Sequence, residues 1–333
     1  MAERAKGDEG AAPGSRALAP IAAAVRRILS GTADGSTATS RAIAKPPGAP
    51  GWFAPDSAAW QVHGDVSTFL GGIRALLLQT LHPLALAGIE GHSSYRDDPF
   101  GRLHRTGAFI AATTFGSAEM AERTVAAISR RHATVTGTAA DGRPYSAEDP
   151  ALLTWVHIAL VDSMLEAYLR FGLNGPLDAD RYVADMAVVG SAMGVPDPPT
   201  SQRQLTAAFE AVRPDLAGGQ LPGEVRHFVL HPPLTFPASL GYGALARAAE
   251  DSLPGWALDL LDVPRRGPAV ASVNRGVAQA LLRTLRAALV ESPARAAARD
   301  RLGVSATEMQ LIERRRTSPA RGRTTTRSEA ASR

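Results

Sequence analysis

The chain has 333 residues, of which 45% are hydrophobic and 20% are charged, and these proportions are typical of a soluble globular protein. It contains no cysteine, which excludes disulfides, zinc fingers, iron–sulfur clusters, thiolate-ligated iron and a cysteine nucleophile. Only 5% of the residues are aromatic, which argues against an aromatic platform for stacking single-stranded nucleic acid.

The net charge of +4 is concentrated at one end of the chain. Positions 314–333 hold seven arginines and one glutamate, a charge of +6, so the rest of the chain carries about −2. A solvated, disordered tail explains this pattern, and non-specific anion binding by the tail is the alternative. The high isoelectric point therefore does not predict a specific nucleic-acid interface.

No segment is expected to cross a membrane. The best apolar run, residues 73–89, is short and is interrupted by Arg74, His82 and Pro83. The apolar stretch near the N-terminus, residues 18–25, is too brief for a signal peptide. We therefore expect a cytoplasmic protein.

Hydrophobic periodicity predicts an all-α protein with one helical domain and one small β-hairpin. We assign residues 1–48 to a disordered leader with one short helix at 21–29, residues 49–316 to the domain, and residues 317–333 to a disordered basic tail. The expected helices lie at 70–89 with a kink or break at Pro83, and at 98–114, 117–134, 149–171, 178–193, 202–212, 240–249, 270–289 and from 306. The hairpin is expected at 134–145, with a two-residue turn at Asp141-Gly142.

Common nucleophile, phosphate-loop and dinucleotide motifs are absent, which leaves eight histidines as the main chemical candidates. Two of them lie on apolar helical faces. His157 shares a face with Leu153, Leu160 and Met164, and His132 shares one with Ala121, Val125, Ile128 and Val135. A buried imidazole needs a partner or a metal, so each is either a satisfied core residue or a ligand.

A basic face is predicted on the helix at 98–114. Arg102, Arg105, Thr106 and Phe109 are spaced i, i+3, i+4, i+7, which places them on one side. The arginines suit a carboxylate held at the edge of a cavity, and a solvated basic face is the alternative. Arg74 is a second candidate of this kind, with a snorkelling side chain as its alternative.

Glu224, His227 and His231 form an E-x-x-H motif with a further histidine at i+4. A di-iron helical bundle needs two such motifs and two more glutamates, and the chain offers only one motif. Metal binding at this cluster is therefore not favoured.

Several short segments, in this order and spacing, resemble one known family. They are GIRALLLQ at 72–79, HP at 82–83, EGHS at 90–93, DP at 98–99, RLHRT at 102–106, RHAxVxGT at 131–138, DGRxY at 141–145, WVH at 155–157 and LVDS at 160–163. Together they resemble the catalytic-domain family of the rubber oxygenases (latex-clearing proteins) and of the ER-bound mycophenolic-acid oxygenase. The resemblance covers roughly residues 58–305.

The resemblance implies a helical fold that holds haem b without covalent attachment. It implies that His132 is the proximal iron ligand. Arg102, Arg105 and Thr106 match the family's R-x-x-K-T segment, whose lysine can lie on the distal side of the iron. Arginine replaces that lysine here, and because a guanidinium stays protonated it is a poor iron ligand. The distal position is therefore expected to be open, or filled by water or another side chain.

The resulting prediction is a haem-dependent oxygenase that uses O₂ to attack a C=C bond of an apolar substrate. His132 would bind the iron, while Arg102 and Arg74 would offset the propionate charge. Arg105 and Thr106 would line the distal pocket, and His157 and His82 would line its wall or bind the cofactor. The alternatives are a non-catalytic haem or apolar-ligand binding protein, and a helical scaffold without a cofactor.

Overall fold

The computed structural model describes residues 37–92, 99–173, 175–234, 236, 238–289 and 291–317, with the side chains of all but 99–103 and 315–317. Its helices are α2 (Ala38–Ile43), α3 (Ala58–His63), α4 (Thr68–Gln79), α5 (Pro83–His92), α6 (Pro99–Phe115), α7 (Ala118–His132), α8 (Pro150–Phe171), α9 (Ala179–Ala192), α10 (Gln202–Val212), η1 (Arg213–Asp215), α11 (Gln220–Leu230), α12 (Ala238–Asp251), α13 (Gly255–Leu260), α14 (Pro268–Leu289), α15 (Pro293–Arg301) and α16 (Ala306–Thr317). One antiparallel hairpin joins β1 (Thr136–Thr138) to β2 (Pro144–Ser146). The all-α prediction is confirmed.

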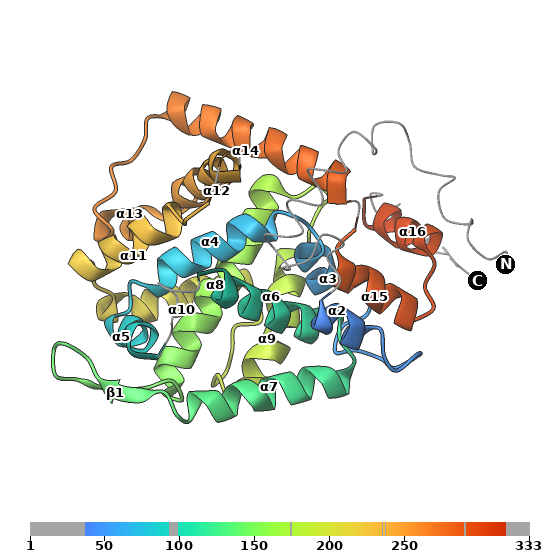
Figure 1. Cartoon of the computed structure of the whole chain (residues 1–333), viewed down its shortest axis with the longest axis horizontal. Coiled ribbons are helices and arrows are strands. Elements are labelled where there is room, and N and C mark those ends of the chain that lie inside the picture. The colour runs from blue at the N-terminus through green and yellow to red at the C-terminus, as the bar shows by residue number, and fades with distance from the viewer. Residues whose placement is uncertain are drawn as a thin grey trace, which may run out of the picture.

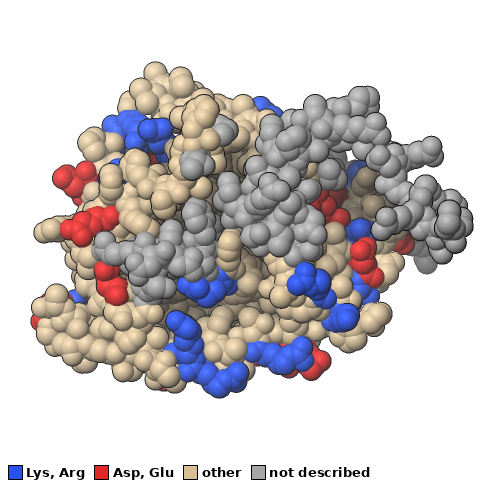
Figure 2. All heavy atoms as spheres, in the orientation of Figure 1, with Lys and Arg blue, Asp and Glu red and all other residues tan. Residues whose placement is uncertain are grey.

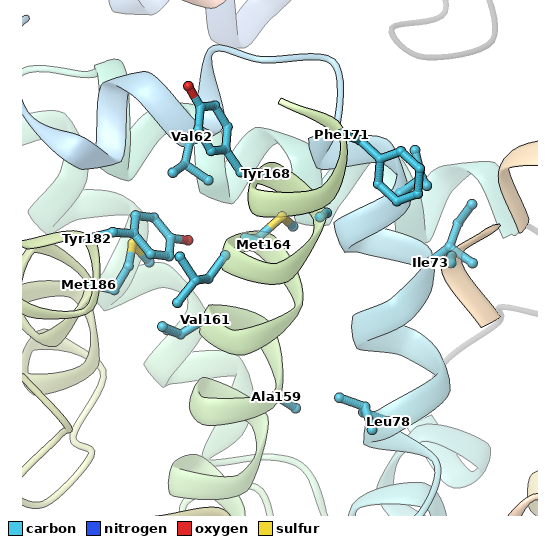
Figure 3. Packing of buried hydrophobic residues seen from close by; sticks show 14 of the residues in the cluster. Val62, Ile73, Leu78, Ala159, Val161, Met164, Tyr168, Phe171, Tyr182 and Met186 are labelled. Atoms are coloured by element: carbon cyan, nitrogen blue, oxygen red, sulfur yellow. The ribbon is translucent and has the colours of Figure 1, made fainter. Parts of the chain in front are cut away.

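Helix α8 lies at the centre of the fold, and the other helices pack around it (Figure 1). Its apolar residues are buried on most of its circumference, and α4 runs alongside it over most of its length. Figure 3 shows Met164 and Phe171 of α8 among side chains of α4 and α9, including Ile73 and Tyr182. This layer forms one large core, against which α12 also packs through α4.

The predicted helix boundaries agree closely where the sequence carries a capping residue. The side chains of Ser117, Asp149 and Asp178 each accept a backbone N–H in the first turn of α7, α8 and α9. The predicted helix at 70–89 is in fact two helices. Their axes differ by 106° at the corner before Pro83, so of the two alternatives expected there the helix breaks.

Part of the predicted disordered leader is ordered. Helix α2 lies within it and packs against α15, and Ile43 is fully buried. The guanidinium of Arg301 donates to the carbonyls of Ile43, Ala49, Phe115 and Gly116, at 2.7–3.2 Å. Residues 37–48 therefore belong to the domain; the helix expected at 21–29 and the basic tail from 318 lie outside the described residues.

The hairpin turn differs from the two-residue prediction. The Ala139 N–H donates to the carbonyl of Arg143 at 2.8 Å, and the Gly142 N–H donates to the carbonyl of Ala139 at 2.9 Å. Three residues, 140–142, therefore form the loop. Gly142 has a φ of +86°, a left-handed conformation that glycine adopts without strain.

Among the described residues, one helix, α8, is long and apolar enough to cross a membrane, and 61% of its most apolar stretch is buried inside the protein. The sequence analysis considered only the run at 73–89, which the structure divides between α4 and α5. The burial of α8 is that of a core helix.

Candidate functional site

Helices α5, α6 and α7 and the hairpin meet at one side of the molecule. Helices α6 and α7 pack together and run in opposite directions, so the start of α6 and the end of α7 lie on the same side (Figure 1). The hairpin continues from α7 and packs against α5. This arrangement brings most of the motif residues singled out in the sequence to one region, which we call the α5–α7 region.

Tyr145 fixes the hairpin to α5. It pairs with Gly137 across the two strands, and a Cβ at Gly137 or Gly91 would come within 2.5 or 2.9 Å of the tyrosine hydroxyl. The His92 ring lies edge-on to Tyr145, and its Nε2 is 3.1 Å from the carbonyl oxygen of Thr136. The glycines of these motifs therefore allow the tyrosine ring to lie directly on the backbone.

His132 occupies the last turn of α7, immediately before the hairpin. Its carbonyl accepts the N–H of Val135 at 2.9 Å, which holds the backbone, but no described residue hydrogen-bonds to its imidazole ring. The side chain is half-buried, and burial lowers its pKa; Glu148 opposes this effect and Arg131 adds to it. At neutral pH the ring is therefore neutral, with a nitrogen lone pair not used by the fold.

Half-buried apolar side chains occur on each helix of the α5–α7 region. In α5, only Leu86 of the apolar side chains is buried, although the helix reads PLALAGIEGH. Phe109 and Ile110 of α6 and Ile128 of α7 are half-buried. A region that combines such side chains with a neutral nitrogen donor is suited to a flat, largely apolar metal macrocycle.

The predicted basic face on α6 is open to solvent where it is described. Arg105 and Thr106 are exposed, and Arg102 lies on the helix but its side chain is outside the described set. Arg102, Arg105 and Thr106 lie in the first half of α6, and Phe115 at the other end of α6 is buried in the core. The fold itself does not bury Arg105 or Thr106.

Arg74, by contrast, is held inside the protein. It is 3% exposed, and its Nη1 lies 2.6 Å from Oδ2 of Asp162 and 2.9 Å from Oγ of Ser163. Its Nε donates to the carbonyl of Ser252 at 3.2 Å. The Asp162 carboxylate therefore already offsets the positive charge, and the geometry does not require an external anion.

His157 packs between α8 and α9. It is 8% exposed, and a Cβ at Gly190 would lie 2.8 Å from its Cε1 and 2.9 Å from its Nε2. Burial lowers its pKa to about 4, so the ring is neutral. The Nε2 side of the ring packs against Gly190 of α9, so this histidine contributes to the packing of α8 on α9.

His82 lies at the corner between α4 and α5. It is almost fully buried, and its ring centroid is 6.4 Å from that of Trp155. Burial lowers its pKa, which Asp215 partly opposes. Within the described structure its Nδ1 has no hydrogen-bond partner, an unusual cost for a buried nitrogen.

The E-x-x-H motif does not form a three-residue metal site. The ring centroids of His227 and His231 are 4.5 Å apart, but the Glu224 carboxylate accepts a hydrogen bond from Gln220 at 2.9 Å. No group of three or more potential metal-binding side chains occurs among the described residues.

The sequence analysis did not foresee one buried hydrogen-bonded group. His63 has its Nδ1 2.7 Å from Oγ1 of Thr114 and its Nε2 3.0 Å from the hydroxyl of Tyr182. Burial lowers the pKa of His63 to about 4 and raises that of Tyr182 well above its ordinary value. No sequence pattern marks this group, because its members come from three separate helices.

The sequence profile described as "ER-bound oxygenase mpaB/B'/Rubber oxygenase, catalytic domain" matches residues 60–308. The chain belongs to this oxygenase family. The match spans α3 to α16 and includes every segment of the α5–α7 region. No curated protein and no solved structure matches the chain significantly.

The motif residues of the chain fall into two groups. Arg74, Asp162, Gly137 and Tyr145 hold the fold together, as their contacts show. The side chains of His132 and Thr106 differ, because they have no hydrogen bond or ion pair in the described structure, and the side chain of Arg105 is exposed. Motif side chains that stay exposed, or that the fold does not use for its own contacts, are the candidates for ligand binding.

Proposed function

We propose that the protein is a haem-dependent oxygenase whose iron is bound by His132 in the α5–α7 region. When bound, haem supplies the ability to activate O₂. The observation that carries the proposal is the half-buried, neutral imidazole of His132, which has no hydrogen-bond partner in the described structure.

The residues of the chain have separate tasks in this proposal. His132 would provide the nitrogen donor, and the Val135 N–H donates to its carbonyl at the junction of α7 and the hairpin, which holds its backbone. Arg105 and Thr106 would offer hydrogen-bond donors to oxygen or substrate, and Arg102 would offset the charge of a propionate. A guanidinium such as that of Arg105 has donors but no lone pair for a metal, so it would orient oxygen or substrate and would not bind the iron.

The substrate class follows from the apolar character of this region. The half-buried aliphatic residues of α5 and α6 would cover the hydrocarbon part of a substrate and exclude water from it. The proposed reaction is oxidative attack by O₂ on a C=C bond of an apolar molecule. The two packed histidines, His157 and His82, act as supports for α8 and α5 in this scheme.

A visible absorption spectrum tests the proposal directly. Protein expressed with a haem precursor should purify with a Soret band, and His132→Ala should lose at least about 90% of it while its far-UV circular dichroism stays unchanged. Added imidazole should restore part of the band, because it replaces the deleted ligand. His227→Ala, which changes an exposed histidine on α11, is the matched control and should retain the haem.

Three outcomes would refute the proposal. Absence of a Soret band in the wild-type protein under haem supply would show that the protein does not bind haem. Full haem content in His132→Ala would show that His132 is not the iron ligand and would make His82, with its unpartnered nitrogen, the next residue to test. A haem protein that consumes no O₂ with any alkene would instead be a haem-binding protein without oxygenase activity.

A further inference from the structure

Two histidine rings meet at the end of α11. His227 lies in the last turn of the helix, and His231 follows the last helical residue, so the two positions are four residues apart on one side of α11. Both residues are exposed, and their ring centroids are 4.5 Å apart with an angle of 31° between the ring planes. Two histidines at i and i+4 have the spacing with which a helix can bind one metal ion.

The backbone of α11 selects one tautomer of His231. The carbonyl oxygen of His227 accepts the backbone N–H of His231 at 3.0 Å, and it also lies 3.0 Å from Nδ1 of the His231 ring. A carbonyl oxygen can only accept, so Nδ1 carries the proton and Nε2 of the neutral ring keeps its lone pair. Histidines that bind metals commonly donate their other ring N–H to a backbone carbonyl in this way.

The imidazole of His227 has no hydrogen-bond partner among the described residues. A metal ion can therefore bind to His227 and to Nε2 of His231 without breaking a hydrogen bond of the fold. The exposed His92 differs, because its Nε2 lies 3.1 Å from the carbonyl oxygen of Thr136. The fold thus leaves one nitrogen available on each of the two adjacent rings of α11.

The charges near the two histidines favour a cation. Helix α11 carries one acid, Glu224, which lies one turn before His227 on the same face. Its one arginine, Arg226, is 2.5 Å from the buried carboxylate of Glu250, so the positive charge of Arg226 is offset. Figure 2 shows more acidic than basic side chains on the left flank of the molecule, where Figure 1 places α11. A cation is therefore not repelled from this side.

We propose that His227 and His231 together bind one divalent transition-metal ion of the Zn²⁺ class. Imidazole nitrogen is a preferred donor for Zn²⁺, Cu²⁺ and Ni²⁺, whereas Mg²⁺ and Ca²⁺ prefer oxygen donors. Water completes the coordination, because no third potential ligand is grouped with the two histidines in the part of the chain that the structure describes. This site lies outside the α5–α7 region and does not depend on haem.

A Zn²⁺ titration of the full-length protein, followed by calorimetry, tests the site. The chain contains no cysteine, so its histidines are its strongest donors for this ion. The wild type should bind one Zn²⁺ per chain, and His227→Gln and His231→Gln should each weaken the binding at least about tenfold. His92→Gln changes another exposed histidine and is the matched control, which should bind Zn²⁺ as the wild type does.

Thermal unfolding provides a second measurement. Free Zn²⁺ at about ten times its Kd should raise the Tm of the wild type by about 3 °C, because the ion binds the folded chain. The same concentration should leave the Tm of the double variant His227→Gln/His231→Gln unchanged, and Mg²⁺ should have no effect on either protein. Circular dichroism checks that the variants fold.

Four results would overturn the inference. Absence of saturable Zn²⁺ binding by the wild type would show that the two rings do not chelate an ion. Unchanged affinity in the double variant would place the ion elsewhere. Loss of Zn²⁺ binding in His132→Ala, with binding retained in His227→Gln, would assign the ion to the proposed iron ligand. Equal stabilisation of the wild type by Zn²⁺ and Mg²⁺ would indicate a non-specific effect of charge.

Discussion

Replacement of Gly190 by alanine tests how His157 is held. The new Cβ would lie 2.8 Å from Cε1 and 2.9 Å from Nε2 of the imidazole, and 3.0 Å from Cβ of Pro198. Overpacking of this kind costs about 1–3 kcal/mol, and the better helix propensity of alanine returns about 1 kcal/mol. We therefore expect Gly190→Ala to lower the free energy of unfolding by up to about 2 kcal/mol.

The double variant gives the sharper result. His157→Ala removes the ring that obstructs the new methyl group, so in that background Gly190→Ala should be neutral or stabilising by up to about 1 kcal/mol. Urea unfolding of the four proteins, followed by circular dichroism, measures the coupling between the two positions. Additive effects of the two substitutions would show that the imidazole does not contact α9 as described. Loss of haem from a stably folded His157→Ala variant would return this residue to the list of ligands.

Four further predictions concern buried groups and the iron environment. The pKa of His63 is about 4 in the folded protein and about 6.5 when unfolded. The contribution of the neutral His63 ring to the free energy of unfolding is therefore complete above pH 6.5 and falls as the pH drops toward 4. At about pH 5 the loss of stability is about 2 kcal/mol. Urea unfolding at a series of pH values should show a smaller loss in His63→Gln than in the wild type. The same pH dependence in both proteins would contradict the lowered pKa of His63. Asp162→Ala should cost about 3 kcal/mol and Arg74→Met about half as much, because Asp162 is 31% exposed and can hydrate whereas Arg74 cannot; the reverse order would refute this account. Arg301→Lys should lower stability by about 2 kcal/mol, because one ammonium cannot reach four carbonyls; a neutral effect in thermal or urea unfolding would argue against this bridging role. In the haem-loaded protein, Arg105→Lys should shift the ferric spectrum partly to six-coordinate low spin, and an unchanged spectrum would place residue 105 away from the iron.

Local signals in the sequence predict much of the fold. Ser117 and Asp149 act within three residues of their helix, so the start of α7 and of α8 can be located from the chain alone. Helix α3 also has a capping residue, Ser57, but its six residues are all buried and therefore show no amphipathic period. Helix α15 was missed for the opposite reason, since it is rich in arginine and its buried positions include Arg301.

The candidate site is less accessible to prediction, because burial depends on distant residues. The faces of α7 and α8 present His132 and His157 in equivalent patterns, and only the fold reveals that Gly190 closes one ring while the other stays half-exposed. Arg74 illustrates the same limit. Its alternatives were an external anion or solvent, whereas its partner is an aspartate 88 positions later in the chain.

The corner between α4 and α5 has a consequence for local stability. It directs α5 away from the main core, so that α5 packs instead on a second, small cluster built on Leu86 and Val225. The amides of α8 should exchange with solvent only when the whole domain unfolds, whereas those of α5 and the hairpin should exchange through smaller, more frequent openings. A ligand bound beside His132 would suppress those openings first. Hydrogen-exchange protection gained in α5, with α8 unchanged, would therefore locate the bound ligand without any spectroscopic property of its own.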